Sequence, residues 1–295
     1  MIIVDINCGL GNQLFQYAFG RYLSIKHNTI LKLDLKSFKT YSSYRNYQLN
    51  SFNIIENIAS IDEVRKFKYQ KPPFNKYIYY KLTGKKLGDK YFTKYSKNFI
   101  SQKQYNFIPE MKELHDNIYL NGFWQSEKYF IEIQDVLKKE FQLKNPPNES
   151  NQKLLDKICS TNSVCLHLRR TDYLNNDFLN GICDLTYYKK ATDYISQRVE
   201  NPVFFVFSDD IEWSKENIKT GFETIFVDVN SEKNAYEDIR LMSNCKNNVI
   251  ANSSFSWWGA WLNNNCDKIV ITPKKWTNDN SIPIDDIACD GWIKI

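Results

Sequence analysis

The sequence has few of the residues that form disulfides or bind metals: seven cysteines and three histidines occur among 295 residues. The cysteines are odd in number, scattered and without a C-x-x-C pair, so neither a disulfide framework nor a zinc site is expected. The histidines lie too far apart for a metal-ligating pattern, and Asp209 and Asp210 in "FSDD" are only a weak metal motif. We therefore expect a protein of the reducing cytoplasm that uses no metal and no cofactor.

Long apolar runs and a strong charge of one sign are also missing. No stretch approaches the roughly 18–20 apolar residues of a membrane-spanning helix. The start "MIIVDINCGLGNQ" has no basic region before an apolar run and does not indicate a signal peptide. The net charge of +5 is mild and spread along the chain, which argues against a nucleic-acid partner. It fits an enzyme that binds a phosphorylated small molecule, with at most peripheral contact to the inner face of the cytoplasmic membrane.

Short apolar runs alternate with helical patterns, most regularly after residue 160. "SVCLHL", "VFFVFSDD", "TIFVDV", "NNVIANSS" and "DKIVITP" read as strands, with helices expected near 187–199, 210–219, 235–245 and 255–264. This alternation predicts an α/β protein with doubly wound parallel sheets. "LKNPPNESNQ" is the best linker in the chain, which gives an N-terminal domain over 1–148 and a C-terminal one over 149–295. Residues 40–110 look irregular and carry no motif.

Polar residues follow three of these strands directly, where open parallel sheets bind ligands. In "SVCLHLRRTDYL" the alternation of side chains puts His167 and Arg169 on one face and Arg170 on the other. Arg169 presents a planar fork of donors that suits a diphosphate, although a surface arginine beside a helix-capping Asp172 is the alternative. His167 is either a core histidine or a ligand donor. Arg170 is expected either to pair with Asp209 or Asp172 or to contact a ligand.

Two further stretches read as sites at helix starts. In "ANSSFSWWGAWLN", Ser253 and Ser254 are N-cap types that would aim a positive helix end at an anion, with an ordinary helix cap as the alternative. The following aromatic stripe, with Trp257, Trp258 and Trp261, is interpreted mainly as packing. In "GLGNQ", glycines permit close ligand approach, and amides face a crevice unless the loop is a structural turn. Leu14 stands where a dinucleotide fingerprint needs its third small residue.

Five motifs together resemble the bacterial α-1,2-fucosyltransferases that use GDP-fucose: "GLGNQLFQYAFG", "GFWQSEKYF", "HLRRTDY", "FSDDIEW" and "ANSSFSWWGAWL". They occur in the family's order, from Ile2 to about Pro273. The H-x-R-R-x-D signature belongs to the wider fucosyltransferase superfamily, and the second and last motifs narrow the resemblance to the α-1,2 group.

The resemblance implies a GT-B fold, in which two Rossmann-like domains face each other across a cleft and the C-terminal one binds most of the nucleotide. It implies inverting, metal-independent transfer of L-fucose to the 2-hydroxyl of a terminal β-galactoside, possibly lipid-linked, in surface-glycan synthesis such as that of O-antigen or capsule. Position by position, Arg169 matches a diphosphate contact, His167 and Asp238 match guanine-reading positions, and Ser254 matches a hydroxyl on the distal phosphate. Asn12 matches an amide near the reacting sugar in protein O-fucosyltransferases. The expected donor site is completed by Gly11, Gln13, Ser253 and Phe255.

The sequence does not indicate the catalytic base clearly. Asp172 is the candidate, with helix capping or pairing with Arg170 as the alternative. Three other functions compete: a fucosyltransferase of another linkage, a non-catalytic carbohydrate-binding protein and a nicotinamide oxidoreductase. Leu14 argues against the oxidoreductase. Arg169 and Asp238 beside a phosphate-type helix end argue against simple carbohydrate binding.

Overall fold

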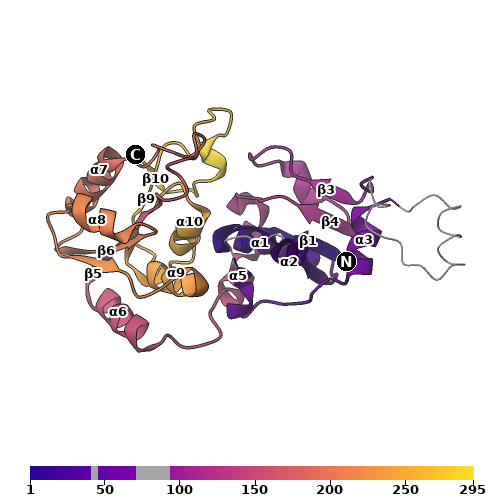
Figure 1. The fold of residues 1–295 in the computed structure, drawn as a ribbon, viewed down its shortest axis with the longest axis horizontal. Helices are drawn as coiled ribbons and strands as arrows, with labels where there is room; N and C mark the ends of the chain where they lie inside the picture. Colours follow the sequence, from indigo (N-terminus) through magenta and orange to yellow (C-terminus); the bar gives the residue numbers. More distant parts are fainter. Residues whose placement is uncertain (41–45, 71–93) are drawn as a thin grey trace, which may run out of the picture.

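Two parallel β-sheets organise the chain (Figure 1). The computed structural model describes residues 1–40, 46–70 and 94–295. The first sheet has the order β2-β1-β4-β3. Its strands are β1 (Ile2–Asp5), β2 (Leu31–Asp34), β3 (Phe99–Ser101) and β4 (Ile118–Asn121). All its pairings are parallel, so the carboxyl ends of the four strands meet at one edge.

Helices cover both faces of the first sheet. Helix α1 (Leu10–Lys26) packs against the face that carries Ile2, Val4 and Leu120. Helix α3 (Ile61–Lys68) begins with a capping box at Ser60, and it buries Val64 and Phe67 on the opposite face. Because both faces are covered, the strands can be apolar on both sides.

The second sheet has the order β10-β9-β8-β5-β6-β7. Its strands are β5 (Asn162–Leu168), β6 (Pro202–Ser208), β7 (Thr224–Val227), β8 (Asn247–Val249), β9 (Val270–Thr272) and β10 (Ile293–Lys294). In chain order within this sheet, this is the doubly wound Rossmann arrangement 3-2-1-4-5-6. The winding direction reverses between β5 and β8, so the crevice beyond those two strand ends is where such sheets bind ligands.

Alternate residues of β5 serve the two faces of this sheet. Val164, Leu166 and Leu168 pack towards α7 (Leu185–Ser196), whereas Cys165 packs towards α6 (Glu149–Ser160) and α9 (Ala235–Asn244). Helix α8 (Ile211–Asn217) contacts β6 and β7. The remaining elements are α2 (Lys36–Thr40), α5 (Gln134–Glu140) and short 3-10 helices at Leu49–Ser51, Pro109–Glu113, Glu127–Tyr129, Ile131–Ile133, Glu232–Asn234 and Ile284–Asp286.

The two sheets are joined through α10 (Ser254–Trp261), which follows β8 and packs on α1 (Figure 1). The ring of Phe15 lies 4.5 Å from that of Trp257 and 4.8 Å from that of Trp258, measured between centroids. Both tryptophans are fully buried, as the sequence-based interpretation of packing predicted, and Trp261 is nearly so. One apolar core therefore runs from the first sheet through α1 and α10 into the second half of the chain.

Glycine 11 permits the closest approach between the two halves. A Cβ atom built on it would lie 2.4 Å from the backbone carbon of Ser254 and 2.5 Å from the backbone nitrogen of Phe255. The indole of Trp258 donates a hydrogen bond of 2.9 Å to the Gly11 carbonyl. Since Gly11 follows β1 and Ser254 follows β8, the carboxyl ends of the two sheets face each other at this contact.

The predicted α/β class is confirmed, and the expected strands and helices of the second half lie within a few residues of their predicted places. The expected irregularity of residues 40–110 is wrong where α3 and β3 form, because each is short and gains stability from packing rather than from its own pattern. Residues 41–45 and 71–93 of that stretch lie outside the described part. The "PPN" linker lies between α5 and α6, and the boundary at residue 148 stays a prediction. None of the described helices is long and apolar enough to cross a membrane.

Gly11→Ala should lower the free energy of unfolding by about 2–3 kcal/mol, because the new methyl group meets backbone that cannot move aside without separating α1 from α10. Urea denaturation measures this. Gly9→Ala is the matched control. A Cβ atom added at Gly9 would have no neighbour within 4 Å, and the residue has an ordinary φ of −70°, so its replacement should change stability by less than about 1 kcal/mol. Equal effects of the two changes would contradict the close contact.

Candidate donor site at the switch point

The switch point between β5 and β8 is flanked in the chain by Arg169, which follows β5, and by the start of α10, which follows β8. Tyr173 ties the two sides together, because its hydroxyl donates a 3.0 Å hydrogen bond to the carbonyl of Asn252. Ser253 is the N-cap of α10, and its hydroxyl accepts from the backbone N–H of Phe255 at 3.3 Å. Ser254 is the first residue of the helix, beside Gly11. The positive end of α10 and the loop that begins at Arg169, which we call the arginine loop, thus border the same switch point.

The guanidinium of Arg169 is held by carboxylates. Its Nε and Nη2 donate to the two oxygens of Asp172 at 2.8 and 2.7 Å, and Asp209 lies 3.3 Å from Nε. The planar fork of Arg169 thus binds a carboxylate in a bidentate manner, and its role towards a diphosphate stays a prediction. The expected pairing of Asp172 with Arg170 is wrong: Asp172 pairs with Arg169. Because Asp172 is about half exposed, an incoming diphosphate can share or displace it.

Arg170 has a structural environment. Its Nε lies 3.1 Å from Asp210, and its guanidinium lies 4.0 Å from the ring centroid of Trp213. Neither of the two predicted carboxylate partners of its side chain, Asp209 and Asp172, is the one found. Asp209 instead accepts from the backbone N–H groups of Arg170 and Thr171 at 2.9 and 3.1 Å, which fixes the turn that follows β5.

"FSDD" therefore orders the arginine loop. Asp210 caps α8 through the N–H of Trp213 in addition to its pair with Arg170. Within residues 1–40, 46–70 and 94–295, no three His, Cys, Asp or Glu side chains come together in a way that could hold a metal ion.

His167 is 4% exposed, and its ring lies 5.9 Å from that of Phe255. Burial lowers the pKa of His167 to about 3, and the positive charge of Arg169 adds to the effect. The imidazole is therefore neutral at physiological pH, with one ring nitrogen able to accept. Its Nδ1 has no hydrogen-bond partner within the described residues, which differs from the satisfied core histidine considered as the alternative.

Asp238 lies on α9, half-buried, and accepts a 2.8 Å hydrogen bond from the amide of Asn230. Burial raises the pKa of Asp238 to about 6, with Glu237 adding to the effect and the Asn230 hydrogen bond opposing it. A carboxylate held in this way gains from any further donor that reaches it, such as paired N–H groups of a bound base.

The two amide residues in the first turn of α1 that were predicted to belong to the site, Asn12 and Gln13, have different roles. The Oδ1 atom of Asn12 accepts a 2.7 Å hydrogen bond from Gln125. Gln13 is fully buried, and its amide donates to the carbonyls of Cys8 and Asn46 at 2.9 Å each. Because both hydrogens of its Nε2 group are donated to backbone carbonyls, Gln13 has a structural role, and we do not include it in the proposed donor site. The side chain of Asn12 is oriented by Gln125 through its Oδ1 atom, and its Nδ2 group is not part of that hydrogen bond.

Gln125 is a residue that the sequence reasoning did not single out, although "GFWQSEKYF" contains it. The preceding Trp124 is completely buried at a φ of +56°, a rare conformation for a bulky side chain. This backbone turn directs Gln125 towards Asn12. Such strain cannot be read from the sequence, but Gln125 lies in "GFWQSEKYF", one of the motifs that carry the family resemblance, and that motif could have drawn attention to it.

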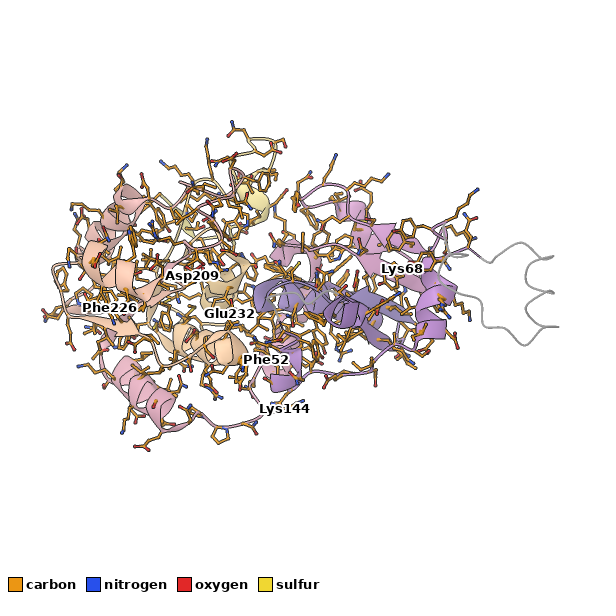
Figure 2. All side chains as sticks on the ribbon, in the orientation of Figure 1. Phe52, Lys68, Lys144, Asp209, Phe226 and Glu232 are labelled. Carbon is orange, nitrogen blue, oxygen red and sulfur yellow. The ribbon has the colours of Figure 1, made fainter. Side chains whose placement is uncertain are left out.

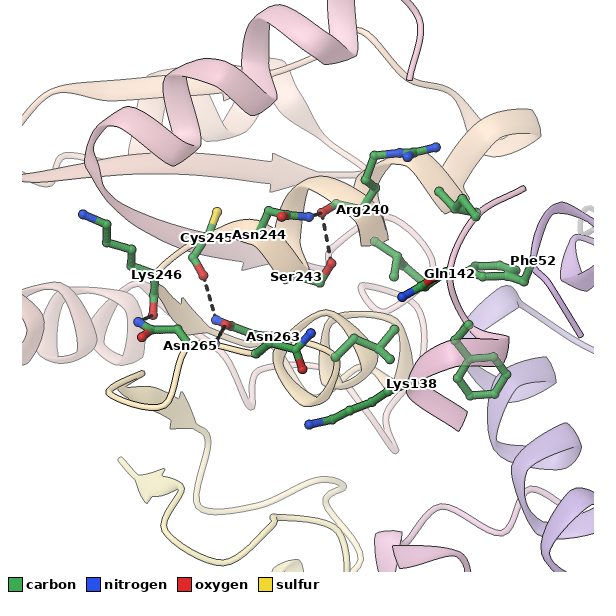
Figure 3. A pocket seen from close by; sticks show the side chains of 15 residues that line it. Phe52, Lys138, Gln142, Arg240, Ser243, Asn244, Cys245, Lys246, Asn263 and Asn265 are labelled. Atoms are coloured by element: carbon green, nitrogen blue, oxygen red, sulfur yellow. Dashed lines mark hydrogen bonds between the residues drawn. The ribbon is translucent and has the colours of Figure 1, made fainter. Parts of the chain in front are cut away.

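A separate pocket of about 380 Å³ lies where α5, α9 and the end of α10 converge, and its walls carry Phe52, Lys138, Arg240 and Lys246 (Figure 3). None of the predicted site residues lines it. Its basic side chains suit an anion, but Cys245 and Lys246 in its wall precede β8, so the pocket lies away from the carboxyl strand ends where such sheets bind ligands, and we do not assign the diphosphate to it. Figure 2 labels Asp209, whose carboxylate lies beside Arg169, and Phe52, which lines this pocket.

A family model, glycosyl transferase family 11, matches residues 1–295 of the chain. The chain belongs to this family. It is thus a glycosyltransferase of the α-1,2-fucosyltransferase family, as the sequence motifs predicted.

Two relatives from Escherichia coli match over nearly the whole length. The α-1,2-colitosyltransferase is 35% identical over 304 residues, which cover 100% of this chain and 99% of that protein. The O-antigen biosynthesis glycosyltransferase WbnK is 34% identical, with 97% and 98% covered. Human galactoside α-(1,2)-fucosyltransferase 1 is 29% identical over 154 residues, which are 48% of this chain and 42% of the human protein.

The fold is similar to that of fucosyltransferase NodZ from Bradyrhizobium, with a TM-score of 0.52 at 15% identity over 88% of this chain and 90% of that chain. The predicted GT-B fold is therefore confirmed. The roles assigned to individual residues stay predictions, because similarity at this level of identity establishes the fold alone.

Asp238→Asn should stabilise the protein at pH 7 by on the order of 2 kcal/mol. Since the folded pKa of Asp238, about 6, lies above the ordinary 3.8, the folded state takes up the proton first as the pH falls. The parent protein therefore loses stability as the pH rises from about 4 to about 6. Urea denaturation should show that the free energy of unfolding of Asp238→Asn exceeds that of the parent protein at pH 7.5 but not at pH 4. Asp267→Asn, at an exposed position, is the control, and an equal gain at both pH values would contradict the burial effect.

Proposed function

We propose that this protein transfers L-fucose from GDP-β-L-fucose to the 2-hydroxyl of a terminal β-galactoside, with inversion at the sugar carbon. The observation that carries the proposal is the placement of Arg169 directly after β5 and of the α10 N-terminus after β8, the two strands at the switch point where a nucleotide diphosphate would lie in this fold. Neutral His167 on β5 and half-buried Asp238 on α9 would read the guanine.

The reaction needs stabilisation of a leaving diphosphate. As the bond from the anomeric carbon to the β-phosphate oxygen breaks, its electron pair leaves with GDP. The acceptor oxygen forms the new bond to that carbon and gives up its proton to the departing diphosphate or to water. Arg169 and the N–H groups of α10 would meet the charge that grows on the β-phosphate, and such preorganised donors are usually the largest catalytic contribution.

Asn12 would lie near the reacting sugar, held there by Gln125. Asp172 is the residue that the sequence offers as a base. Both of its oxygens accept from Arg169, which supports a role in positioning that guanidinium rather than in proton removal. Ser253, Ser254 and Phe255 complete the proposed phosphate end of the site, and Gly11 lets them approach Asn12.

A second candidate donor is GDP-colitose, because the α-1,2-colitosyltransferase matches over the full chain. Colitose is L-fucose without the 3-hydroxyl, so the two donors differ by a single group. The deciding experiment offers both donors with a panel of β-galactosides and assigns the linkage of each product by NMR. A product with fucose on the galactose 2-hydroxyl is expected. A product from GDP-colitose alone, or another linkage, would overturn the proposal.

We place the activity in the cytoplasm at the inner face of the cytoplasmic membrane, where a lipid-linked acceptor would be extended during O-antigen or capsule-like synthesis. WbnK, named as an O-antigen biosynthesis glycosyltransferase, supports this setting. No nucleic-acid partner is proposed.

Activity should be nearly unchanged in excess EDTA, because Arg169 and the helix end take the charge that a divalent ion would otherwise neutralise. The initial rate with and without EDTA measures this. A loss that is restored only by Mg²⁺ or Mn²⁺ would show that the phosphate charge is met by a metal.

Arg169→Lys should lower kcat on the order of 10²–10³, because lysine cannot present two parallel donors to a charge that grows in the transition state. Steady-state kinetics with varied donor measures it. Arg170→Lys is the matched control: it loses the planar contact with Trp213, so it should reduce thermal stability more and kcat less. A fully active Arg169→Lys enzyme would remove Arg169 from the mechanism.

A further inference from the structure

A pocket of about 330 Å³ opens at the carboxyl ends of β1, β3 and β4 in the N-terminal half. Its walls are formed by Asn7, Gln102, Lys103, Gln104, Tyr105, Asn121, Gly122 and Phe123. The lining combines amides with aromatic rings and carries a single charged side chain. This chemistry suits a neutral, hydroxyl-rich ligand better than a phosphate.

Phe123 and Tyr105 line this pocket, and the ring of Phe178 lies beside that of Tyr105 outside the lining; we call these three rings the aromatic platform. The rings of Tyr105 and Phe123 are nearly parallel at 11°, with centroids 6.2 Å apart. Phe178 lies 6.3 Å from Tyr105. Tyr105 is 45% exposed and Phe178 37% exposed, so both rings are accessible to a ligand.

The amides of the pocket wall are held in place. Asn121 donates a 2.8 Å hydrogen bond to Asp5, and Asn7 accepts one of 3.1 Å from Gln16. Gln102 accepts from the N–H groups of Phe123 and Trp124 at 2.8 and 3.0 Å. Its own Nε2 group has no acceptor among the described residues. The polar wall is therefore rigid and retains a donor for a ligand oxygen.

The platform joins the two halves beside the proposed donor site. Phe178 belongs to the loop that begins with Arg169 and Asp172, and its carbonyl accepts a 2.8 Å hydrogen bond from Asn278. Phe123 lies two residues before Gln125, which holds Asn12. A ring resting on the platform would have the leaving diphosphate on one side and Asn12 on the other.

We propose that the aromatic platform binds the terminal galactose of the acceptor. This inference rests on the proposed function for the identity of the acceptor. The C–H groups of C3, C4 and C5 form an apolar face on galactose, and that face meets the electron-rich faces of Tyr105 and Phe178. The hydroxyl groups at the ring edge then reach the amides of Asn7, Gln102 and Asn121. The platform thereby selects the acceptor sugar, whereas Arg169 acts on the donor.

The test replaces the two exposed rings one at a time. Tyr105→Ala and Phe178→Ala should each raise the acceptor KM about tenfold, while the Kd for GDP measured by calorimetry stays within about twofold of the parent value. Tyr105→Phe should restore the parent KM, because the ring and not its hydroxyl makes the contact. Tyr95→Ala is the matched control: Tyr95 is 55% exposed and stacks on Phe99 at 4.0 Å, away from the pocket. An unchanged acceptor KM in both alanine variants would overturn the proposal.

Saturation-transfer NMR with methyl β-D-galactoside, in the presence of GDP, separates this proposal from the proposed function. If no donor supports transfer but the galactoside signal is lost in Tyr105→Ala and retained in Tyr95→Ala, the platform stands and the transferase assignment fails. If transfer occurs and Tyr105→Ala binds the galactoside like the parent, the platform fails alone. Weakened binding of a long-chain alkyl galactoside with unchanged binding of the methyl galactoside would place the aglycone on these rings and also overturn the proposal.

Discussion

The close contact between the first turn of α1 and the N-terminus of α10 is the constraint on which the rest of the molecule depends. Position 11 must be glycine, because a Cβ atom there would overlap the backbone of Ser254. The indole of Trp258 adds a 2.9 Å hydrogen bond to the Gly11 carbonyl. Because each helix follows the carboxyl end of a central strand, this single contact brings two ligand-binding sheet edges together. Asn12 and the Ser253 cap then face the same space.

The apolar packing behind that contact makes the arrangement rigid. Phe130 stacks on Trp258 with the ring planes 16° apart, and Trp257 lies between Phe15 and Trp292. Polar contacts add to it at the periphery: Lys128 pairs with Asp286 at 2.9 Å, and Gln48 of the first half hydrogen-bonds the carbonyl of Glu232. Apolar interfaces of this kind resist the domain motions expected of weakly joined domains. The spacing between the two facing sheet edges is therefore largely fixed by packing.

Local patterns predicted much of this structure from the sequence. The runs around β5, β6 and β8 alternate with helical periods, and polar residues at their ends marked Arg169 and Ser253 as site candidates. Pairing partners could not be predicted in the same way. Asp172 and Asp210 each had more than one arginine within reach along the chain, and only the turn fixed by Asp209 decides which guanidinium meets which carboxylate. The structural role of Gln13 could not be predicted, because its side chain hydrogen-bonds the backbone of Asn46 and Gln48, which are more than 30 residues away in the sequence.

The tryptophans of α10 also bear on whether either half of the chain could exist by itself. A fragment that starts at Glu149 would retain all six strands of the Rossmann sheet. It would nevertheless present Trp257 and Trp258 to water, where Phe15 and Phe130 now cover them. Such a bare aromatic surface promotes self-association. The halves would thus behave as complementary fragments that are soluble when co-expressed and prone to aggregate when produced apart.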